Sequence, residues 1–124
     1  METNVEEISI NGVQYVKKGS RNEPVEVFDG MKYALVRTYS AGVFAGYIEK
    51  KDGMEVTLRN ARRIWYWDGS ASLSELATKG TSKPDNCKFP IEVDKVVLTQ
   101  VLEILDVTKQ AKKSIDEVKI WTQH

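Results

Sequence analysis

Two adjacent arginines followed by three aromatic residues form the segment of the sequence best suited to chemistry. Arg62 and Arg63 stand just before the aromatic residues 65–67. A guanidinium group pairs with phosphate through two parallel hydrogen bonds, and aromatic rings stack on planar groups such as nucleobases. These residue types close together are typical of a site for a nucleotide or another anion. The alternative is that the rings pack within a sheet and the arginines are solvated surface.

The strand that carries this segment decides which of its side chains share a face. Residues 54–59 alternate apolar and polar types, and β-branched and aromatic residues continue to 67, which predicts a long strand over 54–67. In a straight strand the side chains on the solvent-facing side include Arg59, Ala61, Arg63, Trp65 and Trp67. A bulge or bend near Asn60 is expected in so long a strand, and it would instead bring Arg62 and Tyr66 to the face of Arg59. Both registers stay open at this point.

Other segments predict the sheet to which this strand belongs. Segments rich in β-branched and aromatic residues, separated by turn residues, predict a meander of strands over 32–39, 42–50 and 54–67. Further strands are expected at 25–28, 89–93, 96–105 and 118–121. The stretch 89–105 reads as one or two strands rather than a helix, because valine and isoleucine are frequent and no good helix cap precedes it.

Helix signals occur only after the meander. Ser72 stands three residues before Glu75, which is a capping box, and Gly80 can end the helix that follows. Thr108 can cap a second helix over 109–115. The predicted fold class is therefore α+β, an antiparallel sheet or meander with two short accessory helices.

The chain is expected to hold one domain, because 124 residues suit a single core. We assign residues 31–124 to a single α+β ligand-binding domain and residues 1–30 to an N-terminal extension. Within the extension, residues 8–16 alternate around Asn11-Gly12, which is typical of a β-hairpin.

Charge and composition exclude several classes of protein. Eighteen basic and eighteen acidic side chains cancel, but residues 31–67 hold seven basic against three acidic ones. The zero net charge of the whole chain disfavours a general nucleic-acid binder, because such proteins are usually basic. No charge-free run approaches the roughly 18 residues that span a bilayer, so no membrane segment is expected. The acidic start does not resemble a signal peptide, and we expect a cytoplasmic protein.

Metal and cofactor sites are not expected. Cys87 and His124 are the only cysteine and histidine, which is too few for an ordinary zinc site. The sequence has no glycine-rich phosphate loop and no nucleophile elbow, and we assign no catalytic residue. A hydrolase that uses paired carboxylates is left open, because spatial pairing cannot be read from sequence.

Four sequence blocks resemble a known family. They are residues 33–46, the block Asn60-Ala-Arg-Arg-Ile-Trp-Tyr-Trp with the preceding Arg59, residues 69–77 and residues 84–89. These blocks are similar to the Thoeris anti-defence proteins of phages and prophages, and the resemblance covers roughly residues 31–121. The resemblance implies nothing about residues 1–30.

The resemblance implies a sponge rather than an enzyme. Such a protein binds a cyclic ADP-ribose isomer (glyco-cyclic ADP-ribose) made by a TIR-domain immune sensor in the bacterial host cell, and does not cleave it. It also implies a homo-oligomer with pockets at a shared interface, and a second site for cyclic oligonucleotides. On this basis we expect phosphate and ribose contacts from Arg37, Asn60, Arg62 and Arg63, and ring stacking from Trp65, Trp67 and Phe89.

Two other functions compete with this one. A nucleic-acid-binding phage module would use the same arginines and rings to follow a phosphate backbone, although the zero net charge disfavours it. A hydrolase of the same signal would release a product instead of the intact ligand.

Overall fold

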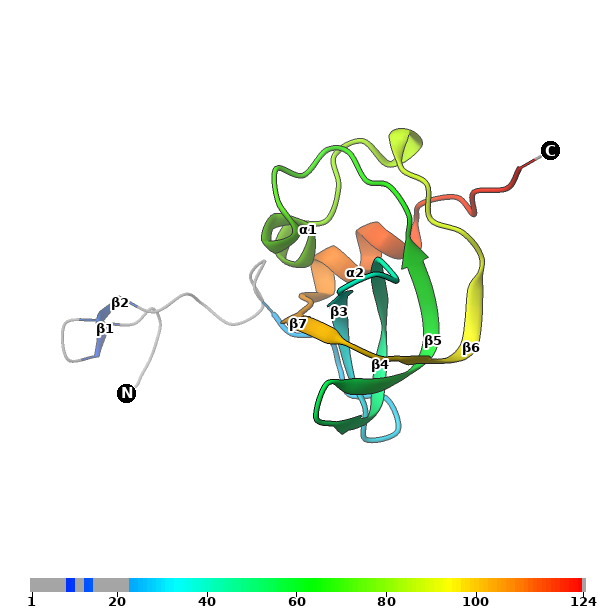
Figure 1. The fold of residues 1–124 in the computed structure, drawn as a ribbon. Coiled ribbons are helices and arrows are strands. Elements are labelled where there is room, and N and C mark those ends of the chain that lie inside the picture. The colour runs from blue at the N-terminus through cyan, green and yellow to red at the C-terminus, as the bar shows by residue number, and fades with distance from the viewer. Residues whose placement is uncertain (1–8, 11–12, 15–22, 124) are drawn as a thin grey trace.

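The computed structural model describes residues 23–123 and the backbone of two short strands before them (Figure 1). These strands, β1 (Ser9–Ile10) and β2 (Val13–Gln14), pair antiparallel. The pairing confirms the predicted hairpin. The Asn11-Gly12 turn lies outside the described residues.

The domain is built on a five-stranded antiparallel sheet in the order β6-β5-β4-β3-β7. Its strands are β3 (Lys32–Thr38), β4 (Val43–Asp52), β5 (Glu55–Ile64), β6 (Glu92–Leu98) and β7 (Val101–Asp106). The helices are α1 (Leu73–Lys79), the 3-10 turn η1 (Pro84–Asn86) and α2 (Lys109–Asp116). The α+β class with a meander sheet is therefore confirmed.

Two of the short strands predicted from sequence are not strands. Residues 25–28 and 118–121 make only isolated bridges, such as the one between Phe89 and Ile120. Residues 25–28 cannot add a strand beside β3, because β3 already pairs with β4 on one side and with β7 on the other. Residues 23–30 instead run beside α2, where the Glu23 carbonyl accepts a hydrogen bond from the Lys109 amide.

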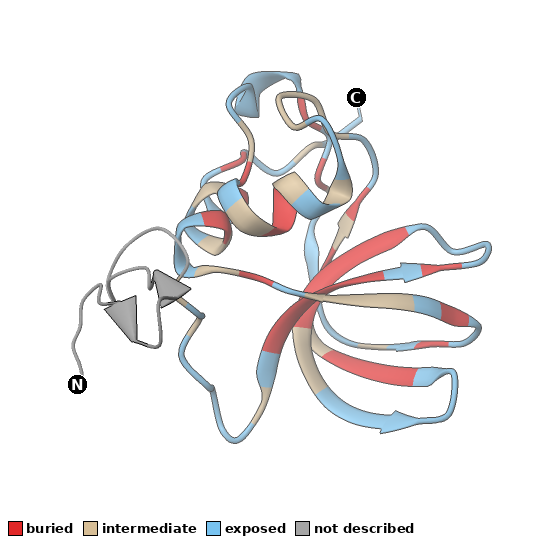
Figure 2. Cartoon of the chain, turned by 90° about the vertical axis from the view of Figure 1, so that its left-hand side faces the viewer, coloured by how far each residue is buried: buried red, intermediate tan, exposed pale blue. Residues whose placement is uncertain are grey.

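The sheet curls until its two edge strands almost meet. β6 and β7 lie at opposite edges, yet only Thr99 and Gln100 separate them in the chain. Gln100 adopts a left-handed φ of 56°, and its carbonyl accepts a hydrogen bond from the Tyr39 amide at 3.0 Å. Figure 2 shows the strongly bent sheet that results.

Both faces of the sheet are buried as a consequence. One cluster lies inside the curl, and it includes Leu98 and Val101 from the two edge strands together with Phe44. The other cluster lies between the opposite face and the helices, and it includes Leu35, Leu76 and Ile115. The face of β5 that the alternation assigned to solvent is partly covered as well, since Thr57 on that face is 8% exposed. Ala61 lies beyond the bulge on the other face, where it is buried in the cluster inside the curl.

A bulge in β5 settles the register that the sequence left open. Asn60 has a left-handed φ of 51°, and the pairing with β4 shifts beside it. Arg59 is opposite Tyr47, and Arg62 is opposite Ala45. Residues two apart on β4 share a face, so Arg59 and Arg62 also share one. The bulged alternative is the one that the structure adopts.

The two helices lie side by side over the sheet (Figure 1). The predicted caps form, since the Ser72 hydroxyl accepts from the Glu75 amide at 3.1 Å and the Thr108 hydroxyl from the Ala111 amide at 3.0 Å. The Thr108 hydroxyl also donates to the Thr78 carbonyl, which ties α2 to the end of α1. Neither helix of the described chain is long and apolar enough to cross a membrane.

Gly80, the C-cap of α1, lies close to Ser114 of α2, and its substitution tests the packing of the two helices. It has φ 80° and ψ −157°, and an added Cβ would collide with Ser114 Cβ on α2. We predict that Gly80→Ala lowers the free energy of unfolding by about 2–4 kcal/mol, from backbone strain and overpacking together. Gly53→Ala is the control in urea denaturation, because Gly53 also has a positive φ but faces open space, and it should cost about 1 kcal/mol. Equal losses for both variants would contradict the tight packing.

Candidate functional site

A cavity of about 440 Å³ opens between the helix-covered face of the sheet and α2. Its size falls within the range of small-molecule sites. Strands β3 to β6 form one wall, α2 forms another, and the segments before β3 and after α2 form the mouth. The lining residues are Phe28, Tyr33, Tyr47, Asn60, Arg62, Glu92, Lys112, Asp116, Val118 and Ile120.

The Arg62 guanidinium is buried at the cavity wall and bound by main-chain carbonyls. Arg62 is 7% exposed. It donates from Nη1 to Ile115 O at 2.9 Å, and from Nη2 to Phe89 O at 3.0 Å and Val118 O at 2.8 Å. Its Nε donates to Pro90 O at 3.1 Å, and its charged group lies 5.4 Å from the centre of the Phe89 ring. The carbonyls at the end of α2 are the negative pole of that helix, which favours a cation there.

Among the described residues, one of the Arg62 donors has no acceptor. A guanidinium has five N–H groups, and four of them serve the carbonyls, which leaves one on Nη1. Within residues 23–123, no carboxylate makes an ion pair with Arg62. Burial lowers the pKa of Arg62, and the charges of Asp116 and Glu92 act in the opposite direction. The group stays charged, because the ordinary pKa of arginine is so high.

Tyr33 adds a second buried polar group to the cavity. It is 6% exposed, and its hydroxyl makes no hydrogen bond to any residue of the described chain. Burial is the main cause that raises the pKa of Tyr33 far above its usual range, with a further contribution from Asp116. The hydroxyl is therefore protonated at neutral pH and able to donate. A buried polar group without a partner is costly, which makes it a candidate contact for a ligand.

Lys112 and three aromatic rings complete the cavity wall. Lys112 Nζ lies 4.9 Å from the centre of the Tyr33 ring and 2.6 Å from Asp116 Oδ2. The Tyr47 ring lies 5.0 Å from the Tyr33 ring and 5.2 Å from the Phe28 ring, measured between centroids. The cavity thus combines donors for an anion with ring faces for a planar group.

The described residues hold no cluster of three or more His, Cys, Asp or Glu side chains that could bind a metal ion. The cavity donors are a guanidinium, an ammonium, hydroxyls and an amide, which suit an anion better than a cation.

Of the seven site residues expected from sequence, the structure brings three together. Asn60 and Arg62 line the cavity, and Phe89 lies behind Arg62. Phe89 is 0% exposed, so its ring packs in the core and has no free face for stacking on a ligand. At the cavity wall, Phe89 contributes its main-chain carbonyl, which accepts a hydrogen bond from Arg62.

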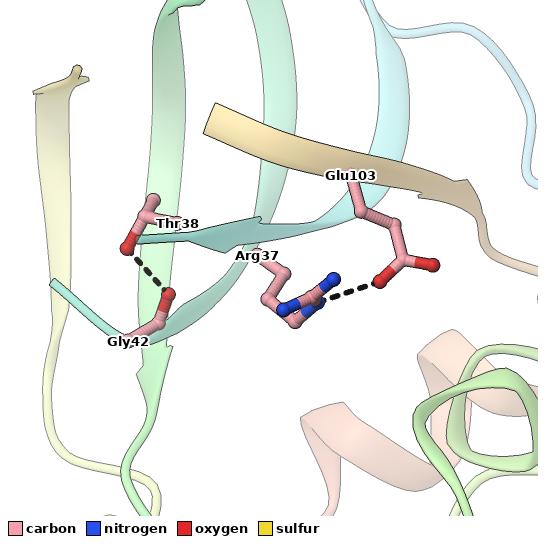
Figure 3. A network of polar contacts seen from close by, with 4 residues as sticks. All are labelled: Arg37, Thr38, Gly42 and Glu103. Atoms are coloured by element: carbon pink, nitrogen blue, oxygen red, sulfur yellow. Dashed lines mark hydrogen bonds and ion pairs between the residues drawn. The ribbon is translucent and has the colours of Figure 1, made fainter. Parts of the chain in front are cut away.

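The other four expected residues lie away from the cavity lining. Arg37 donates from Nε to Glu103 Oε1 at 2.7 Å, near the turn where the Thr38 hydroxyl donates to the Gly42 carbonyl (Figure 3). Arg63 projects to the opposite face of β5, where it covers the Phe44 ring and donates to the Ala41 carbonyl.

The two tryptophans beyond β5 differ in burial. Trp67 is half-buried against the core, and Trp65 is 63% exposed. The contiguous patch of arginines and rings that the sequence suggested is therefore divided between two faces of the sheet.

Sequence reasoning missed most of the cavity, namely Phe28, Tyr33, Tyr47, Glu92, Lys112 and Asp116. The strand residues among them had a usable signal, since Tyr33 and Tyr47 become neighbours once β3 and β4 pair. The residues on α2 had none, because their approach to the sheet depends on tertiary packing.

Replacing Arg62 tests its place in the structure. We predict that Arg62→Met lowers the free energy of unfolding by more than about 3 kcal/mol, because several buried carbonyls lose their donor. Arg63→Met is the matched control and should cost about 1 kcal/mol, since it loses one carbonyl contact and one ring contact. Urea denaturation at pH 7 measures both. A small loss for Arg62→Met would show that its carbonyl contacts are dispensable.

Replacing Tyr33 tests its unpaired hydroxyl. We predict that Tyr33→Phe does not lower the free energy of unfolding at pH 7, because no hydrogen bond is lost and a buried hydroxyl without a partner is removed. An unfolded tyrosine loses its proton near pH 10 while folded Tyr33 retains it, so Tyr33 makes the parent less stable as pH rises above 10. This contribution is about 1.4 kcal/mol per pH unit, and Tyr33→Phe should remove it. Denaturation from pH 7 to 11 measures it, and an unchanged slope would contradict the burial of the hydroxyl.

Comparison with known proteins identifies a family. No curated protein and no solved structure matches the chain. Residues 31–115 match the family described as a domain of unknown function, DUF6948. The matched region contains β3 to β7 and nearly all of α2, and with them most of the cavity lining. Since it covers more than half of the sequence, the chain belongs to the DUF6948 family.

Proposed function

We propose that the chain is a phage or prophage anti-defence protein that binds and sequesters a cyclic ADP-ribose isomer, glyco-cyclic ADP-ribose, in the cavity beside Arg62 without cleaving it. The ligand comes from the resemblance of the sequence blocks to Thoeris anti-defence proteins. One observation supports the site: a buried arginine that pairs with no carboxylate of residues 23–123 lines a cavity of small-molecule size. The protein would act in the cytoplasm of the bacterial host, where the signal is made.

Arg62 and Tyr33 support the binding of a phosphate. Arg62 and Tyr33 line the same cavity, and in the described part of the chain one Nη1 donor and the Tyr33 hydroxyl have no partner. Lys112 adds a second cation to the cavity. Charge-assisted hydrogen bonds of this kind contribute about 1.5–3 kcal/mol each. Four carbonyls already hold the guanidinium in place, so little side-chain entropy is lost when a ligand binds.

The rings at the mouth support the binding of adenine. Phe28 is 51% exposed and contacts the half-buried Tyr47 ring. An adenine stacked there would stay connected to a phosphate at Arg62, because both groups line one cavity. Ile120, on the same rim, is 55% exposed.

Exposed apolar residues at the mouth agree with the further expectation of a homo-oligomer. A second copy that covers Phe28 and Ile120 would bury them and close the cavity at a shared interface. The cyclic oligonucleotide site that the resemblance implies would be separate from this cavity.

Release of intact ligand is the test of sequestration. We predict that the protein, mixed with cyclic ADP-ribose and separated from free ligand, retains the ligand and returns it unchanged after heat denaturation. Recovery of a cleaved product would indicate a hydrolase. Failure to retain the ligand, together with tight and strongly salt-dependent binding of single-stranded DNA, would favour the nucleic-acid module.

Substitutions of two neighbouring lysines on α2 test whether the ligand binds in this cavity. Lys112→Gln should weaken binding about tenfold, because Asp116 would face the ligand without its cation. Lys113→Gln is the matched control, since Lys113 is exposed and does not line this cavity. Calorimetry that shows the same affinity for both variants would place the ligand elsewhere.

A further inference from the structure

Glu92 lies directly beside Arg62 on the neighbouring strand. The two residues are direct partners in the antiparallel pairing of β5 with β6. Partners of this kind project to the same face of a sheet, and both line the cavity. They nevertheless form no ion pair, because the guanidinium turns inward to the carbonyls of Phe89, Ile115 and Val118.

Glu92 keeps its carboxylate free. It is exposed, and it makes no hydrogen bond or ion pair with any residue between 23 and 123. A cation and an anion that face one cavity without forming an ion pair leave room for a ligand between them. The cavity therefore offers donors on one side and an acceptor on the other.

The charged side chains lie at different depths of the cavity. Lys112 and Asp116 pair with each other and largely cancel. The unpaired positive charge is that of Arg62 at the buried wall, and the unpaired negative charge is that of Glu92 at the exposed rim. When a ligand places one anionic group at Arg62, the rest of the ligand lies at the rim and faces the Glu92 carboxylate.

We infer that Glu92 determines specificity: it accepts hydrogen bonds from ribose hydroxyls of the ligand and repels nucleotides that carry additional phosphates. A carboxylate accepts from vicinal hydroxyls readily, and acidic residues hold ribose in this way in dinucleotide-binding folds. A cyclic nucleotide with a single internal diphosphate fits this arrangement. A linear triphosphate brings surplus negative charge to the rim. This inference rests on the proposed function, because it concerns the same cavity.

The experiment compares Glu92→Gln with the parent for two probes, cyclic ADP-ribose and ATP, by calorimetry. The variant should bind cyclic ADP-ribose about threefold to tenfold more weakly, since one hydroxyl contact loses its charged acceptor. It should bind ATP about threefold to tenfold more tightly, since the repulsion at the rim is removed. Asp94→Asn is the matched control, because Asp94 is exposed on the same strand and outside the cavity lining. It should change both affinities less than twofold.

The possible outcomes distinguish the specificity role of Glu92 from the proposed function of the protein. If the parent binds cyclic ADP-ribose and Glu92→Gln leaves both affinities unchanged, the specificity role is wrong and the proposed function stands. If the parent binds ATP but not cyclic ADP-ribose, the proposed function is wrong, and tighter ATP binding by Glu92→Gln would still support repulsion at the rim. If the parent binds neither probe, both are wrong.

Discussion

The burial of one guanidinium group is the constraint on which the rest of the domain depends. Arg62 leaves water only because four main-chain carbonyls replace its hydration, and these carbonyls come from two segments far from β5 in the sequence. Phe89 and Pro90 lie before β6, while Ile115 and Val118 lie at the end of α2. One side chain thus joins the last helix to the sheet. The cavity forms where these parts meet, so its shape and the stability of the fold are coupled.

The bulge at Asn60 makes this arrangement possible. Without the extra residue, the alternation along β5 would place Arg62 inside the curl of the sheet, among the aliphatic side chains around Leu58. In that interior Arg62 would lose the four carbonyls that it now reaches, and its charge would carry a large desolvation cost. Asparagine tolerates the left-handed backbone that the bulge needs, and its side chain lines the cavity. The same residue therefore sets the register and contributes to the site.

The sequence predicts the elements better than their assembly. Capping residues, turn glycines and β-branched runs are local signals, and they place α1, α2 and the meander correctly. The length of the strand also predicts the bulge or bend near Asn60, although it leaves the register open. The site was harder to predict because it depends on distant packing. Arg63 and Trp65 look like partners of Arg62 in sequence, but one faces the Phe44 ring and the other lies beyond the strand. The true neighbours of Arg62 become visible only when α2 is docked.

A crystal structure of the protein with cyclic ADP-ribose would show whether the cavity beside Arg62 is the ligand site. We expect a phosphate oxygen within hydrogen-bond distance of Arg62 Nη1 and of the Tyr33 hydroxyl, with the carbonyl contacts of Arg62 preserved. A ligand bound instead over the exposed Trp65 ring, with the cavity filled by solvent, would contradict this expectation.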